Sequence, residues 1–431
     1  MQQLETSPVA ASAGWMTRRS LLWTGFALVH GWLIWLCLSA VGWPLGDVEG
    51  VYRPWAELSV SGDAIVGIDT PFVYPIIALV PMVLALAFGS AAYALVWLGL
   101  VTVLDAVAFA VLLGMGRAPT RRLAGTAWWW LAFLLLLGPI ALARIDSITV
   151  PLVIIALLWL RTRPFWGVVL LTVATWVKVW PAAALAALVV VSPRRWRITL
   201  IAGVTSAVIV VIALILGSGL NVVSFVGQQT GRGIQIESPV GTIWMWLAAL
   251  GVPGSTVYYD FDILTFQVVG PGTDLAALLM TPLLVLAVGV VLLLGVRAQR
   301  RGAAIETLLP PLVLALVLTM ITINKVGSPQ FISWIAAPLI LGIAVGGARW
   351  STPAILGLVL AALTQLIYPY FYDGLLVPTV AMVLVLTLRN VLEFVLLGWA
   401  LWALATAHIR RDGSGGTQLP GAHFSPELVK E

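Results

Sequence analysis

The chain has 431 residues, of which 61% are hydrophobic and only 10% are charged, and its formal net charge is +5. Soluble domains carry roughly 25% charged residues, so the composition excludes a water-soluble globular protein and indicates a polytopic membrane protein. The basic residues stand in short clusters, which argues against nucleic-acid binding, and the single cysteine, Cys37, excludes an intramolecular disulfide.

Apolar runs of about 20 residues can cross a bilayer, and clusters of arginine mark the ends of such runs that face the cytoplasm. Placing the arginine clusters of this chain inside predicts an all-α polytopic membrane protein with about twelve crossings. These are residues 20–42, 91–115, 124–140, 147–160, 165–177, 181–192, 198–217, 275–296, 305–322, 330–347, 352–368 and 389–408.

The predicted organisation is a cytoplasmic segment over residues 1–19, a transmembrane domain over 20–411 and a cytoplasmic tail over 412–431. The tail is polar and rich in glycine and proline, a composition typical of disorder. Two loops on the outer side are long and run from about residue 43 to 90 and from about 218 to 274. Within the first of them, the apolar run Phe72–Phe88 is expected to lie along the membrane surface or to dip in without crossing.

Two of the predicted crossings, 165–177 and 181–192, are short and flank Lys178. They would form a tight hairpin with Lys178 at its outer tip. The alternative is one long helix over 164–192, which places Lys178 in the middle of the membrane, adds a crossing at 72–88 and moves several arginine clusters outside. Because a charged group in hydrocarbon is costly, the hairpin is favoured.

The first outer loop begins with the stretch GWPLGDVEGVYRPWAEL, which is unusually rich in charge for this chain. Its candidate functional residues are Asp47, Glu49, Tyr52 and Arg53, followed by Tyr74 before a proline. Tyr52 and Trp55 could stack on a sugar ring, although aromatic residues are also common at membrane interfaces, and Tyr74 could simply start an interfacial helix. Glu49 could bind a sugar or orient Arg53, and both acids could equally be solvated loop residues.

The other outer turns carry the remaining polar residues that lie outside the arginine clusters, so the predicted topology gathers them on one side. The candidates are Arg144 and Asp146 in ARID, Lys178 in WVKVWP, Arg232 and Glu237 in GRGIQIES, and Asn324, Lys325 and Gln330 in NKVGSPQ. Simpler interpretations are also open: Arg144 and Asp146 could pair only with each other, and Lys178 could be a snorkelling lysine.

Cationic residues at a membrane surface have lipid phosphates as natural partners, and Lys178, Lys325, Arg144 and Arg232 could surround one. Acids on the same face could activate a hydroxyl group. Sugar transfer from a lipid phosphate needs both parts: a carboxylate as general base for the acceptor, and cations for the charge that grows on the departing phosphate. One base acting opposite the leaving group would invert the anomeric centre, by analogy with inverting glycosidases.

The chain resembles the GT-C glycosyltransferases, and among them the actinobacterial polyprenol-phosphate-mannose-dependent mannosyltransferases of glycosyltransferase family 87. The motifs that carry the resemblance occur in the expected order along nearly the whole chain. They are GDVEGVYRPWA, VYP at Val73–Pro75, RIDS, KVWP, GRGIQIES, NKVGSPQ and LRN at Leu388–Asn390. One difference is that the late outer turn, TINKVGSPQ, lacks a histidine that some members have there.

This resemblance implies a multi-pass plasma-membrane enzyme with its active site on the extracytoplasmic side. It would move mannose from polyprenyl-phosphate-mannose to a hydroxyl group of a cell-envelope glycolipid or lipoglycan. The resemblance assigns the role of general base to Asp47, and we expect no metal or other cofactor. Two alternatives stay open: a transferase for arabinose or another polyprenyl-phosphate sugar, and a flippase or transporter for lipid-linked sugars, which typically shows inverted repeats and polar residues in both leaflets.

Overall fold

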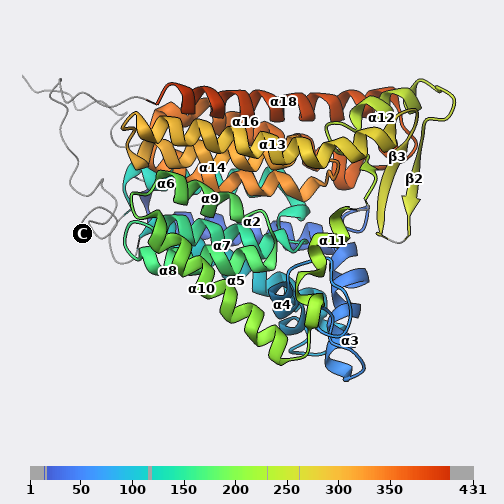
Figure 1. The fold of residues 1–431 in the computed structure, drawn as a ribbon, viewed down its shortest axis with the longest axis horizontal. Coiled ribbons are helices and arrows are strands. Elements are labelled where there is room, and N and C mark those ends of the chain that lie inside the picture. Colours follow the sequence, from blue (N-terminus) through green and yellow to red (C-terminus); the bar gives the residue numbers. More distant parts are fainter. Residues whose placement is uncertain (1–13, 15–16, 115–118, 231, 262, 408–431) are drawn as a thin grey trace, which may run out of the picture.

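The computed structural model describes residues 14, 17–114, 119–230, 232–261 and 263–407, and this part of the chain is mostly helical (Figure 1). The predicted tail, 412–431, and most of the predicted N-terminal segment, 1–19, lie outside the described residues. Eight helices of the described part are long and apolar enough to cross a membrane. Seven of them are α2 (Arg19–Ser39), η4 (Ser90–Ala92) continuing into α5 (Tyr93–Leu113), α6 (Arg121–Leu137) continuing into η5 (Gly138–Ala141), α10 (Arg195–Ile215), α13 (Thr273–Arg300), α14 (Ile305–Thr322) and α18 (Val380–Ala405).

The eighth helical stretch, Pro329–Tyr370, is 42 residues long and folds back on itself. It consists of η7 (Pro329–Ile335), α15 (Ala336–Gly346), η8 (Gly347–Trp350), α16 (Ser351–Gln365) and η9 (Leu366–Tyr370). Since α16 packs against both α15 and η7, the chain reverses at η8, where Gly347 has a φ of +58°. This one stretch therefore contains the two crossings that the sequence predicts at 330–347 and 352–368.

Three apolar helices are shorter: α7 (Asp146–Trp159), α8 (Pro164–Val177) and α9 (Ala182–Val191). With them, every crossing predicted from the sequence overlaps a helix. The break between α8 and α9 follows the predicted hairpin, because Lys178 is extended (φ −153°, ψ 143°) and α8 packs against α9. Pro181, which has no backbone N–H to continue a helix, stands immediately before α9.

The first long loop is packed against the bundle, and no part of it is long enough to span a bilayer. It contains η2 (Val48–Tyr52), α3 (Arg53–Ser61), η3 (Ile76–Ala78) and α4 (Leu79–Leu84). Within Phe72–Phe88 the longest helix, α4, has six residues, whereas a crossing needs about 20. The side chains hold it in place: α3 packs against α4, and η3 packs against α8.

The second long loop contains a small β-sheet, which corrects the prediction of an all-α protein. Its elements are η6 (Gly219–Val223), α11 (Ser224–Thr230), β1 (Ile234–Gln235), α12 (Thr242–Ala249), β2 (Thr256–Asp260) and β3 (Thr265–Val269). The strands pair antiparallel in the order β1-β3-β2. The sequences TVYYD and TFQVV consist mainly of β-branched and aromatic residues, which favour strands, and the span-based prediction overlooked this signal.

The last helix, α18, begins at Val380 and not near Arg389, which corrects the predicted crossing 389–408. Its start is capped by Thr379, whose hydroxyl accepts a hydrogen bond from the backbone of Met382. Arg389 consequently lies inside the helix, where its side chain is buried. A helix before it, α17 (Asp373–Leu376), has only four residues and connects η9 to α18.

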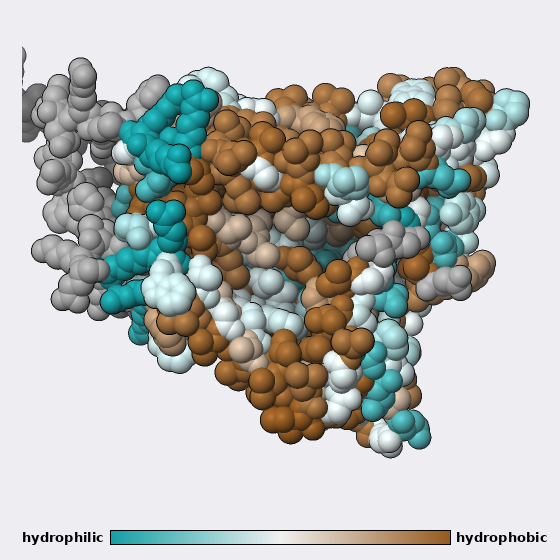
Figure 2. All heavy atoms as spheres, in the orientation of Figure 1, coloured by the Kyte–Doolittle hydropathy of each residue, from teal (hydrophilic) through white to brown (hydrophobic). Residues whose placement is uncertain are grey.

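The arginine-bearing helix ends lie together. Arg19 at the start of α2 donates to the carbonyl oxygen of Gly114 after α5, and Arg122 at the start of α6 donates over 3.0 Å to Val345 in α15. Figure 2 shows hydrophilic residues at the two ends of the long helices and a largely hydrophobic surface between them. This is the distribution of a multi-pass membrane protein, in which the apolar middle faces lipid.

Candidate functional site

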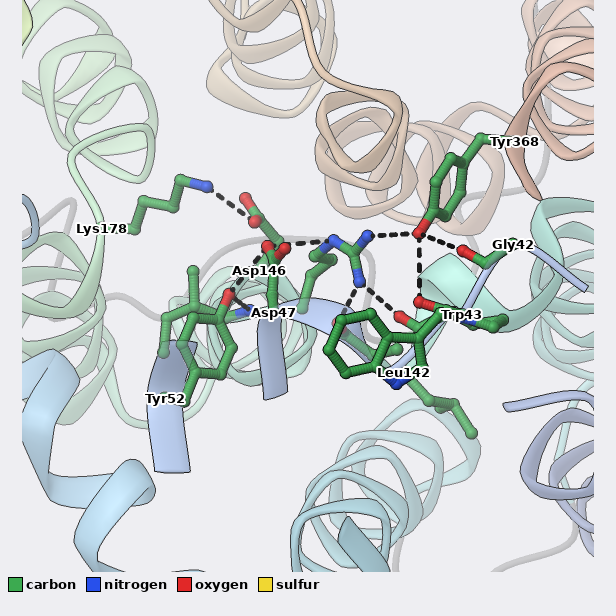
Figure 3. A network of polar contacts seen from close by, with 12 residues as sticks. Gly42, Trp43, Asp47, Tyr52, Leu142, Asp146, Lys178 and Tyr368 are labelled. Carbon is green, nitrogen blue, oxygen red and sulfur yellow. Dashed lines mark hydrogen bonds and ion pairs between the residues drawn. The ribbon is translucent and has the colours of Figure 1, made fainter. Parts of the chain in front are cut away.

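Two ion pairs lie close together at the end of the bundle opposite those arginines (Figure 3). Arg144 Nε is 3.2 Å from Asp47 Oδ2, and Lys178 Nζ donates to Asp146 Oδ2 over 2.7 Å. Arg144 and Asp146 stand at the start of α7, Lys178 follows α8, and Asp47 immediately precedes η2. The structure therefore brings together four residues that the sequence predicted to share a site.

The chain turns sharply between α2 and Asp47. Gly42 and Trp43 both have positive φ values, +79° and +48°. A Cβ atom on Gly42 would lie 2.8 Å from the carbonyl oxygen of Pro369, so only glycine fits this close approach. The turn places the Asp47 loop directly against η9, the segment that contains Tyr368.

Arg144 is the centre of the network, and all three of its guanidinium nitrogens are used. Nη1 donates to the carbonyl oxygens of Pro44 and Ala143 over 2.6 and 2.7 Å, and Nη2 donates to the Tyr368 hydroxyl over 3.0 Å. Its side chain is only 6% exposed, whereas that of Asp47 is 37% exposed. A buried cation needs such compensation, and here it comes from neutral acceptors as well as from Asp47.

Tyr52 supports Asp47 from behind. Its hydroxyl accepts a hydrogen bond from the backbone N–H of Ile145 over 3.1 Å and donates to Asp47 Oδ2 over 3.5 Å. The ring is buried and packs against Trp97, so the structure does not place Tyr52 where it could stack on a sugar.

The Asp146–Lys178 pair is enclosed by aromatic rings. Trp334 Nε1 donates to Asp146 Oδ1 over 2.5 Å, and the Lys178 ammonium lies 5.4 to 5.8 Å from the ring centres of Tyr74, Phe331 and Trp334. Such cation–π contacts stabilise a desolvated ammonium by ~2 kcal/mol. This environment is more specific than that expected of a snorkelling lysine.

Arg232 and Lys325 add positive charge beside this enclosure. Burial lowers the pKa of Lys325, and the nearby Arg232 lowers it further. The pKa of Arg232 is also lowered by burial, against the opposing effects of Tyr74 and Asp260. Burial raises the pKa of Tyr74, and the carboxylates of Asp47 and Asp146 raise it further. Tyr74 therefore lies near the acids Asp47 and Asp146 and near the cations Lys178 and Arg232.

Other predicted residues have structural roles. Trp43 Nε1 donates to Glu49 over 3.0 Å, whereas Arg53 lies 3.9 Å from Glu57, so Glu49 does not orient Arg53. Asn324 accepts from the backbone of Val326 and donates to Met320, which shapes the turn after α14.

The turn that contains Asn324 is joined to the second long loop. Gln235 donates its backbone N–H to Lys325, and its side chain accepts from Gly327. Gln330 is half-buried, and its backbone oxygen accepts from Ser333. These contacts hold Lys325 in place next to the loop that carries Arg232.

Glu237 belongs to a second buried cluster. Its carboxylate accepts from Arg389 Nη1 over 2.6 Å, and Glu393 lies 3.5 Å from the same arginine. Asn390 accepts from Arg389 and donates to Thr242 over 2.8 Å. Burial raises the pKa of Glu237, and Arg389 opposes this rise. The cluster fixes the second long loop to α18.

Sequence reasoning missed three partners. Tyr368 and Trp334 stand in predicted outer turns or beside them, and the signal that could have found them was their aromatic hydrogen-bonding capacity next to charged turns. Asp105, an acid inside a predicted crossing without an assigned partner, pairs with His30 in α2 over 3.1 Å.

No group of three or more His, Cys, Asp or Glu side chains within the described residues could hold a metal ion.

Comparison with protein families gives one match: residues 72–268 match the model described as Glycosyltransferase family 87. The matched region contains Tyr74, Arg144, Asp146 and Lys178, and also most of the second long loop, which carries Arg232. Asp47 precedes the matched region. No curated protein and no solved structure matches the chain. Over residues 72–268 the chain is therefore similar to glycosyltransferase family 87, a family of GT-C type membrane glycosyltransferases.

Proposed function

We propose that this protein is a membrane glycosyltransferase that moves mannose from polyprenyl-phosphate-mannose to a hydroxyl group of a cell-envelope glycolipid or lipoglycan. The reaction takes place on the extracytoplasmic side and inverts the anomeric centre. Asp47 acts as the general base. The observation that carries the proposal is the pairing of a partly exposed carboxylate, Asp47, with a buried arginine at the mouth of a cation-rich site.

Asp47 suits the role of base better than the other acids nearby. Its side chain is 37% exposed, whereas Asp146 and Glu237 are each 1% exposed and are held in ion pairs. An acceptor hydroxyl can therefore reach Asp47 but not the other two. The ion pair with Arg144 and the hydrogen bond from Tyr52 both involve the same oxygen, Oδ2, which leaves Oδ1 of Asp47 to take the proton.

The cations near Tyr74 would bind the phosphate of the donor. Arg232 lowers the pKa of Lys325, as expected of two cations that repel each other, and an anion bound by both would relieve that repulsion. Lys178 also lies against the Tyr74 ring, although in this structure it is paired with Asp146. The cations would stabilise the charge that develops on the departing lipid phosphate.

A lipid-linked donor also needs access from the bilayer. Figure 2 shows a hollow in the surface between α13 and α10. These two helices have the least buried candidate spans, with 11% and 17% of their residues buried. This recess favours a route by which an isoprenoid chain could lie against the bundle while its phosphate reaches the site.

A transfer assay with purified protein, labelled polyprenyl-phosphate-mannose and a panel of envelope glycolipids tests the proposal. We expect inverted mannosyl product from the wild type and none from Asp47→Asn. Decaprenyl-phospho-arabinose offered in parallel distinguishes the alternative donor. A flippase would instead move labelled lipid across proteoliposome membranes without forming product, and Asp47→Asn would then lack a transfer phenotype.

A further inference from the structure

The guanidinium group of Arg144 can contact a carboxylate through one nitrogen atom or through two. Its Nε and Nη2 atoms point in parallel, so together they can bind both oxygens of one carboxylate. In this structure only Nε contacts Asp47, at 3.2 Å. Nη2 is turned toward the Tyr368 hydroxyl, 3.0 Å away, and Nη1 is occupied by two backbone carbonyl groups.

Tyr368 is itself well fixed. Its hydroxyl lies 3.4 Å from the carbonyl oxygen of Gly42 and 3.5 Å from that of Trp43, so it can donate to the Asp47 loop while accepting from Arg144. The guanidinium carbon lies 5.3 Å from the centre of its ring, and Tyr372 packs edge-on against the ring at the same distance. Figure 3 shows the Tyr368 hydroxyl beside the carbonyl groups of Gly42 and Trp43.

We propose that Tyr368 is a positioning residue for the transfer reaction: its hydroxyl holds Arg144 Nη2 turned away from Asp47 and thereby limits the arginine to a single contact with Asp47. The inference rests on the proposed function only in giving Asp47 the role of base. With one contact, Asp47 Oδ1 stays free for the acceptor hydroxyl. With two, both carboxylate oxygens would be engaged by the cation, and Asp47 would be a weaker and less accessible base.

Other titratable and charged groups lie near Asp47, and a test has to keep them unchanged. They are Tyr52 and Glu49 on its own segment, Asp146 at the start of α7, Tyr74 before η3, Lys178 after α8 and Tyr368 in η9.

The test is Tyr368→Phe, which keeps the ring and removes the hydroxyl. Nη2 is then released to bind Oδ1 of Asp47. We expect kcat to fall ~3- to 10-fold while KM for the donor changes little, and the acid limb of the kcat/KM profile to move to lower pH. An acid limb that stays in place, or that moves to higher pH, overturns the proposal.

Two further variants separate positioning from a general loss of structure. Tyr52→Phe removes a donor from Asp47 Oδ2, so its acid limb should move in the opposite direction, to higher pH. Tyr370→Phe removes a hydroxyl from an exposed ring two residues away, and we expect it to behave as the wild type. A structural defect alone would not shift two profiles in opposite directions.

A measurement without turnover makes the inference independent of the donor. Carbodiimides modify protonated carboxyl groups, so mass spectrometry of Asp47 labelling against pH reports its protonation directly. The labelling midpoint should be lower in Tyr368→Phe than in the wild type, and an equal midpoint would contradict the inference. If the midpoint shifts while no variant or wild type transfers sugar, the positioning stands and the proposed function fails.

Discussion

Arg144 Nε lies 3.2 Å from Asp47 Oδ2, and this ion pair joins the first long loop to the start of α7. The pair is asymmetric. The arginine is buried and has three further acceptors, whereas the aspartate is partly exposed. The Asp47 carboxylate can therefore react with an acceptor at the surface of the site, because the buried Arg144 does not depend on Asp47 alone for compensation of its charge.

Asp47→Asn should abolish transfer and preserve the fold. The amide cannot take up a proton, and loss of a general base typically reduces kcat by about 10²- to 10⁴-fold. Arg144 keeps the carbonyl groups of Pro44 and Ala143 and the Tyr368 hydroxyl. We therefore expect a melting temperature near that of the wild type, measured by thermal unfolding in detergent.

Glu49→Gln is the matched control, since Glu49 stands two residues away and is held by Trp43 rather than by Arg144. It should retain most of the activity. If Glu49→Gln is as inactive as Asp47→Asn, the two acids act together and the assignment of one base is wrong.

Asp146→Ala should destabilise the protein much more than Asp47→Ala. Asp146 is almost fully buried, and its removal leaves Lys178 without its carboxylate inside an aromatic enclosure. Breaking such a buried pair costs about 3–5 kcal/mol. The apparent melting temperature of the two variants decides the point, and equal losses would show that Lys178 finds another anion.

Arg389→Leu should be destabilising for a related reason. Removing this cation leaves Glu237 and Glu393 facing each other in a buried space, at a cost of about 3–5 kcal/mol. In the double variant Arg389→Leu/Glu393→Gln one of the two charges is removed, so part of the loss should return. Thermal unfolding together with limited proteolysis of the second long loop would test whether the cluster fixes that loop.

The sequence was sufficient to predict a helix at each expected crossing, although not the start of α18, because apolar length and arginine clusters report directly on the cost of placing charge in lipid. It was also sufficient to group Asp47, Arg144, Asp146 and Lys178, since each stands at a helix end that the topology places on one side. The pairing between them was not predictable: Asp146 could have paired with Arg144 next to it, and only the packing of α8 brings Lys178 to it.

The wrong start predicted for α18 and the burial of Glu237 have the same physical origin. Arg389 and Glu237 each look like surface residues in isolation, because a lone buried charge is prohibitively costly. Together they neutralise each other, so α18 begins before the arginine and Glu237 is held in a buried ion pair. The β2–β3 hairpin was missed because its strand signal lies between membrane spans and not in them.

Donor binding should weaken as pH rises through the pKa of Lys325, which lies below its usual value of 10.5 because of burial and the neighbouring Arg232. The folded protein favours the neutral lysine, so folding stability rises with pH between the lowered pKa and the unfolded value. A bound anion favours the charged form of Lys325, and the phosphodiester of the donor keeps its single negative charge throughout this pH range. Equilibrium binding of polyprenyl-phosphate-mannose to the Asp47→Asn variant, measured against pH, isolates this effect because no turnover occurs. Adding Lys325→Arg should remove the pH dependence, since arginine stays charged. If the affinity falls equally steeply with arginine at this position, Lys325 does not contact the phosphate.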